Sequence, residues 1–152
     1  MRSDHIFRDI GQSVRLVGFH ILGIEDAETG LPLFVYTVGM ARLQLPDVIS
    51  FGVRHDSIAP ALNTYCLELI TGKRKPGPAV IDDWFSVPVT VIEASASMAR
   101  PYAIQAYAYS EHRGWAPPRF MQWVWPDKSG NLPWERGFDQ ALSLRQPVLR
   151  TN

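Results

Sequence analysis

Three strand-like segments lie in the first third of the chain, before any clear helical pattern, and this order limits the folds open to it. Residues 14–24, 33–38 and 47–53 are each rich in β-branched and aromatic side chains. A polar run at residues 25–30 separates the first two segments and is typical of a hairpin turn. Because the links are short, we expect an antiparallel meander rather than strands joined by crossover helices.

The rest of the chain alternates helical and strand-like patterns. Residues 57–71 place Ile58, Leu62, Tyr65 and Leu69 on one helical face, and Gly72 is suited to end that helix. Beyond it we predict a strand at 85–92, a helix at 98–109, a strand at 120–125 and a short helix near 138–144. The order predicts an α+β fold: a mostly antiparallel sheet of about five strands with two main helices on one face. A partly closed, barrel-like sheet is the alternative.

Composition narrows the class of protein. The 152 residues are 46% hydrophobic and 20% charged, which is ordinary for one globular domain, so we expect residues 1–152 to form a single domain. Fifteen basic residues balance fifteen acidic ones, giving no global attraction to nucleic acid or to an anionic membrane. The first residues are polar and no apolar stretch is long enough to span a bilayer, so we expect a cytoplasmic protein.

The sequence shows no motif of a catalytic, metal or cofactor site. His5, His20, His55 and His112 are scattered without the spacing of metal ligands, so no metal is expected and the cofactor stays unknown. Cys66 lies in an apolar helical pattern and is expected to be a buried, unreactive thiol.

A set of polar and aromatic side chains is the best candidate for a ligand site. Two of them end the second strand, and the others lie on the last strand or just after it: Tyr36, Thr37, Gln122, Trp125, Asp127 and Trp134. Aromatic walls with a few polar groups are typical of small-molecule pockets. The alternative is structural: Asp127 would organise a turn before Gly130, and the indoles would fill the core. Both interpretations stay open at this stage.

Several motifs give the chain a family resemblance. The segment 34–40 (Phe-Val-Tyr-Thr-Val-Gly-Met), the Trp-Pro-Asp triplet at 125–127 and the Gln-Pro-Val-Leu run at 146–149 resemble a bacterial family known only as domain of unknown function 4262. That family usually carries His-Pro-Glu where this chain has Leu-Pro-Asp at 45–47, which argues against a metal or acid–base role there. The resemblance implies one domain over most of the chain and brings no activity with it.

Three functions are consistent with these features. The first is a protein that binds a small molecule, such as a nucleotide-like one, in a tryptophan-rich pocket without catalysis. The second is an enzyme with an acid–base site built from His20, Tyr36 and Asp127. The third is an interaction module that docks a partner, or a second copy in a homodimer, through Trp115 and Trp134.

Overall fold

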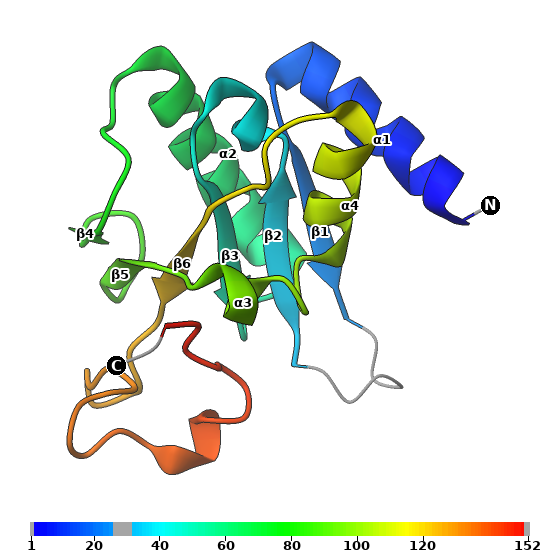
Figure 1. Ribbon diagram of the computed structural model, residues 1–152. Helices are drawn as coiled ribbons and strands as arrows, with labels where there is room; N and C mark the ends of the chain where they lie inside the picture. Colours follow the sequence, from blue (N-terminus) through cyan, green and yellow to red (C-terminus); the bar gives the residue numbers. More distant parts are fainter. Residues whose placement is uncertain (1, 26–31, 151–152) are drawn as a thin grey trace.

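The computed structural model describes residues 2–25 and 32–150, and within these ranges a six-stranded sheet organises the molecule (Figure 1). The strands are β1 (His20–Ile24), β2 (Phe34–Val38), β3 (Asp47–Phe51), β4 (Ala79–Ile81), β5 (Val89–Glu93) and β6 (Phe120–Val124). Their order is β1-β2-β3-β6-β5-β4, with β3 and β6 parallel and every other pair antiparallel. The predicted α+β class and mainly antiparallel sheet are confirmed, and the sheet is open rather than closed into a barrel.

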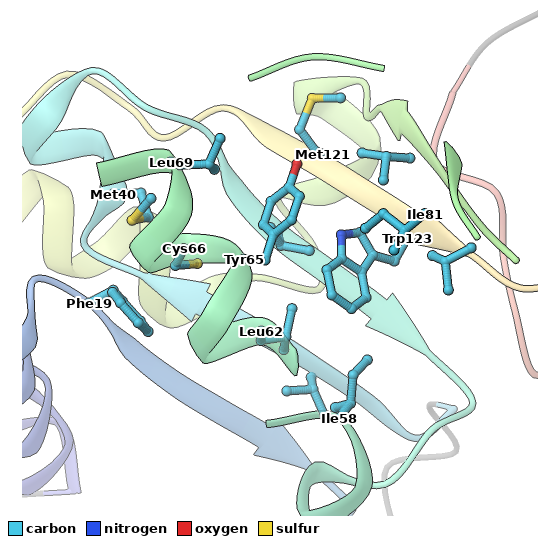
Figure 2. Close-up of a cluster of buried hydrophobic side chains, with 14 residues drawn as sticks. Phe19, Met40, Ile58, Leu62, Tyr65, Cys66, Leu69, Ile81, Met121 and Trp123 are labelled. Carbon is cyan, nitrogen blue, oxygen red and sulfur yellow. The ribbon is translucent and has the colours of Figure 1, made fainter. Parts of the chain in front are cut away.

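The helices cover both faces of the sheet, whereas the sequence predicted two on one face. Helix α2 (His55–Thr71) buries Ile58, Leu62, Tyr65 and Leu69 against one face, as the spacing predicted. Figure 2 shows these side chains beside Trp123 and Met121 of β6. The other face lies against α1 (Arg2–Val17), α3 (Ala96–Ala99) and α4 (Ile104–Arg113). The strands are apolar on both faces, so both have to be covered.

The N-terminal helix α1 was not predicted. The sequence placed a strand over residues 14–24, but the helix continues to Val17 and the strand begins only at His20. Ile6, Ile10 and Val14 recur at helical spacing and pack on the sheet face that α4 also covers. The β-branched residues near position 14 therefore belong to a helix. Gly18, at φ 102°, ends this helix.

Proline residues explain two further differences. Pro101 divides the predicted helix 98–109 into α3 and α4, and Pro88 delays the strand predicted at 85–92 until Val89. The short edge strand β4 was not predicted, and the helix expected near residue 138 is the single 3₁₀ turn η3 (Gln140–Leu142). Residues 26–30 of the predicted hairpin turn lie outside the described residues.

Candidate functional site

The sheet topology places the two halves of the predicted aromatic site at opposite ends of the sheet. Strand β2 runs antiparallel to β3, and β3 runs parallel to β6. The C-terminal ends of β2 and β6 therefore lie at opposite ends of the sheet. Thr37 therefore lies near one end, where β2 stops, while Trp125 and Asp127 follow β6 at the other end (Figure 1), and Tyr36 lies in the middle of β2. Of the six residues, Tyr36 and Gln122 share a row across the sheet, with Ile49 of β3 between them.

Tyr36 is buried and its hydroxyl stabilises the start of α4. The Tyr36 hydroxyl oxygen accepts a hydrogen bond from the backbone N–H of Gln105 at 3.2 Å. Gln105 belongs to the first turn of α4, where backbone N–H groups have no partner within the helix. Burial raises the pKa of Tyr36 to about 12. The hydroxyl is therefore neutral and already bonded.

Thr37 joins a buried polar network at the turn between β2 and β3. Its hydroxyl donates to Asp47 Oδ1 at 2.7 Å and accepts from the backbone N–H of Val48 at 3.0 Å. The N–H of Met40, in the 3₁₀ helix η2 (Met40–Leu43), donates to the same Asp47 oxygen at 3.3 Å. Burial raises the pKa of Asp47 to about 7, because the bonds from Thr37 and Met40 offset only part of the desolvation. Thr37 of the Tyr-Thr-Val-Gly motif thus stabilises this turn.

Gln122 and Trp125 tie β6 to the C-terminal segment and to β3. The side-chain amide of Gln122 donates to the carbonyl of Pro147 and accepts from the N–H of Leu149. The indole N–H of Trp125 donates to Ser50 Oγ at 2.8 Å. In this structure the polar atoms of both side chains are bonded to the chain itself.

Asp127 and Trp134 lie in the loop after β6. Asp127 Oδ1 accepts from the backbone N–H groups of Ser129 and Asn131, and its Oδ2 accepts from that of Asp139. Desolvation opposes ionisation, but these bonds prevail and the pKa of Asp127 is lowered. Trp134 is 41% exposed, with the guanidinium of Arg150 4.2 Å from its ring centre. Ligand binding by the six residues stays a prediction.

His20 does not meet Asp127. It lies half-buried at the start of β1, where its Nδ1 is hydrogen-bonded to Ser13 Oγ at 2.7 Å. Desolvation lowers its pKa. Three strand spacings, about 14 Å, separate β1 from β6, and the two residues also lie at opposite ends of their strands. Among the described residues, no group of three or more His, Cys, Asp or Glu side chains could hold a metal ion.

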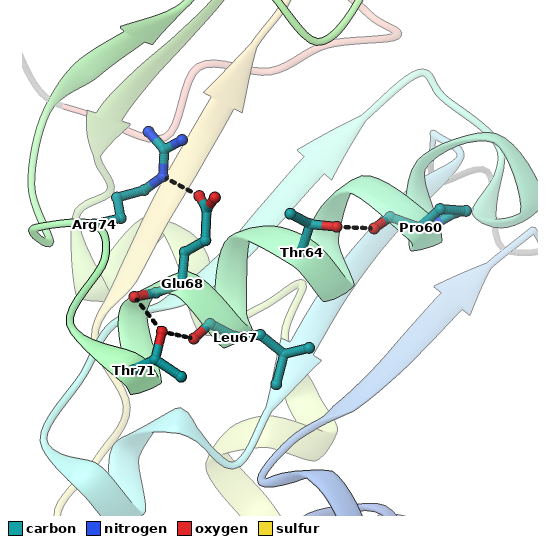
Figure 3. A network of polar contacts seen from close by, with 6 residues as sticks. All are labelled: Pro60, Thr64, Leu67, Glu68, Thr71 and Arg74. Carbon is teal, nitrogen blue, oxygen red and sulfur yellow. Dashed lines mark hydrogen bonds and ion pairs between the residues drawn. The ribbon is translucent and has the colours of Figure 1, made fainter.

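Cys66 and Arg74 are both accounted for by their surroundings in the fold. Cys66 is buried in α2, and burial raises the pKa of its thiol, which suits an unreactive side chain. Arg74, in the basic run after α2, forms an ion pair with Glu68 at 2.9 Å (Figure 3) and lies 4.9 Å from the ring centre of Trp84.

A cleft of about 750 Å³ is lined by residues of α1, α2 and α4, at the same end of the sheet as Thr37. We call it the α1–α2–α4 cleft. Its walls combine aliphatic, aromatic and basic side chains with backbone: Gly11, Val14, Arg15, Leu16, Val17, Gly18, Arg42, Leu67, Ile70, Tyr109, Arg113 and Trp115. Figure 1 shows α1 and α4 side by side at this end of the molecule.

Two glycines allow the backbone around the cleft to pack closely. Gly39 has φ 115°, and a Cβ there would lie 2.8 Å from Val14 Cγ2 and 3.2 Å from the carbonyl oxygen of Gly18. At Gly18 itself a Cβ would lie 3.1 Å from Ile70 Cδ1. The segment that approaches Gly39 so closely is the connection between α1 and β1.

The charges of the cleft distinguish it from other hollows of the surface. Its lining contains three arginines and no carboxylate. Hollows of about 420 and 390 Å³ both include Glu93, and one of about 510 Å³ includes Asp83. The α1–α2–α4 cleft is larger than these three hollows, and all of its charged side chains are basic. It is therefore the best candidate site.

Sequence reasoning missed this cleft because its residues come from four separate segments. The helix α1, which supplies one wall, was not predicted, and its last residues, 14–17, were assigned to a strand. A usable signal was present: Ile6, Ile10 and Val14 at helical spacing followed by Gly18, with Arg15 in the last turn.

Fold and cleft together define a small α+β protein with an arginine-rich, partly aromatic cleft between its helices. A family model matches residues 13–139, which include all but one of the residues that line the cleft. The chain belongs to this family, described as domain of unknown function (DUF4262). A search of curated proteins found no match, and a search of solved structures found none either. No helix among residues 2–25 and 32–150 has the length and apolar character needed to cross a membrane.

Proposed function

We propose that this protein binds a small organic molecule in the α1–α2–α4 cleft. The observation that carries the proposal is the cleft itself, whose volume of about 750 Å³ falls in the range of ligand sites, roughly 300 to 1,000 Å³. The side chains predicted from sequence contribute less, because the polar atoms of Tyr36, Thr37 and Gln122 are bonded within the chain.

The chemistry of the walls supports an organic ligand. Leu67 and Ile70 of α2 and Val14 of α1 line the cleft and offer an apolar surface. Tyr109 and Trp115 pack edge to face, with ring centres 5.5 Å apart, and so present a rigid aromatic wall. A ligand with an apolar body gains from burying that body against these side chains.

A thermal-shift screen against nucleotides, sugar phosphates, organic acids and aromatic amines tests the proposal, with hits followed by calorimetry. The variant Leu67→Trp fills the cleft with an indole, because Leu67 is 38% exposed on its wall. Val80→Trp is the matched control, since Val80 is 60% exposed on the edge strand β4. We expect hits that stabilise the wild type and the control but not Leu67→Trp. A panel without hits, or hits that Leu67→Trp retains, would contradict the proposal.

The rim of the cleft favours a second candidate function, docking of a partner protein or of a second copy. Leu16 is 81% exposed and Val17 is 48% exposed at the end of α1. Neighbouring exposed apolar side chains are typical of interaction surfaces. Light scattering after size-exclusion chromatography, compared between the wild type and a Leu16→Glu variant, distinguishes a dimer that uses this rim from a monomer.

A further inference from the structure

We infer that the ligand of the α1–α2–α4 cleft is an organic anion: an apolar, flat body that carries a phosphate, sulfonate or carboxylate group held by Arg42 and Arg113. The inference rests on the proposed function and specifies the chemistry of its ligand.

The three arginines come from separate elements and converge on one cavity. Arg15 lies in the last turn of α1, Arg42 in η2 and Arg113 in the last turn of α4. Among the described residues none of the three forms an ion pair. Guanidinium groups without carboxylate partners are free to bind an anion through paired N–H donors.

Arg42 and Arg113 have defined positions in the cleft. Arg42 Nη2 lies only 3.5 Å from the point where a Cβ on Gly18 would sit, so its guanidinium reaches the backbone that lines the cleft. The Arg113 guanidinium carbon lies 5.6 Å from the ring centre of Trp115, a cation–π distance. A charged group is therefore placed beside the aromatic wall, which suits a ligand that combines an anion with a flat apolar body.

Helix ends near the cleft reduce its positive charge but do not cancel it. α1 and α4 both end at the cleft, and Leu67 and Ile70 belong to the last turns of α2. Each helix C-terminus contributes about half a negative charge. Together, the three helix ends offset about half of the positive charge of the three arginines. The arginines therefore carry more positive charge than is needed to neutralise the helix ends. The remainder favours an anion.

A matched pair of fluorescent probes tests the inference. The sulfonate 8-anilinonaphthalene-1-sulfonate and the neutral N-phenyl-1-naphthylamine share one aromatic body and differ in the anionic group. We expect the sulfonate to bind more tightly than the neutral probe and to weaken as salt is added. Arg42→Gln and Arg113→Gln should each lower sulfonate affinity roughly three- to fivefold. Neither variant should change binding of the neutral probe.

Controls separate charge from folding. Arg136→Gln removes an exposed arginine in the loop after β6 and should leave both affinities unchanged. Arg42→Lys keeps the charge and should retain more sulfonate affinity than Arg42→Gln. Circular dichroism melting checks that each variant is folded, because unfolded or molten chains also bind the sulfonate.

The outcomes distinguish the inference from the function on which it rests. If neither probe binds, and Leu67→Trp changes nothing, the cleft is no ligand site and both ideas fail. If both probes bind equally well and the arginine variants have no effect, the cleft binds small molecules but has no preference for anions. Equal loss of both probes in Arg42→Gln would show that Arg42 shapes the apolar walls, and it would also overturn the inference.

Discussion

Asp47 makes the stability of this protein depend on pH in an unusual direction. The residue is fully buried, and although Oδ1 accepts two hydrogen bonds, Oδ2 has no hydrogen-bond partner among the described residues. Desolvation of the charged form raises its pKa to about 7 in the folded chain, against about 3.9 in an unfolded one. The folded state thus binds the proton more tightly, so the contribution of Asp47 to stability is full below about pH 4 and is lost as the pH rises through about 7.

The size of the effect follows from the two pKa values. Integrating proton uptake between about pH 4.5 and about pH 8 gives a loss of about 3 kcal/mol in the free energy of unfolding. Asp127 has the opposite dependence, because its lowered pKa adds stability at higher pH that is lost on acidification. The wild-type profile combines both, and a variant is needed to isolate Asp47.

Asp47→Asn provides that comparison, because asparagine keeps an oxygen for Thr37 and Met40 but does not titrate. Urea unfolding followed by circular dichroism at several pH values between 4.5 and 8 gives the free energy of unfolding of both proteins. We expect the wild type to lose about 3 kcal/mol relative to Asp47→Asn across this range. A difference that stays the same at every pH would refute the reasoning.

Three further predictions concern the described contacts. Tyr36→Phe leaves the N–H of Gln105 without its acceptor and should cost about 1 kcal/mol in urea unfolding. Gly39→Ala, at φ 115°, should cost about 2 kcal/mol or more, because its Cβ meets backbone and side chain. Gly72 also has a positive φ, 80°, but a Cβ there meets open space, so Gly72→Ala should cost about 1 kcal/mol. Asp127→Asn replaces one of the two carboxylate oxygens, which together accept from three backbone N–H groups, with an NH2 donor, so the loop after β6 should be cut faster in limited proteolysis while the sheet stays intact.

The spacing of apolar residues along the sequence correctly predicted helix α2 and strand β6. Helix α2 has an unbroken apolar stripe and a glycine end, and β6 alternates strictly, with Met121 and Trp123 on one face and Phe120 on the other. Helix α1 was missed because β-branched residues near its end fit a strand equally well, and only packing decides between the two. Short motifs predicted the family, and the family model that matches residues 13–139 confirms it.

The candidate site could not be predicted from local sequence patterns, because it depends on the topology of the sheet. Tyr36 and Asp127 are both buried polar residues next to aromatic ones, so their sequence context resembles that of a pocket. Whether such residues meet depends on strand direction. The parallel pairing of β3 with β6 places Asp127 beyond the end of the sheet opposite to the end of β2, while Tyr36 stays in the middle of β2. The cleft, in contrast, needs Arg42 and Arg113 to converge from segments about seventy residues apart, which no motif records.

Titration of the ¹⁵N-labelled protein with 8-anilinonaphthalene-1-sulfonate, followed by NMR, would show directly where an anionic ligand sits. We predict that the largest shift changes occur at the backbone amides of Gly18 and Arg42 and at the indole N–H of Trp115, which line the cleft. Changes concentrated at Trp134 and in the loop around Asp127, with the cleft signals unmoved, would contradict the account and return the site to the aromatic C-terminal segment.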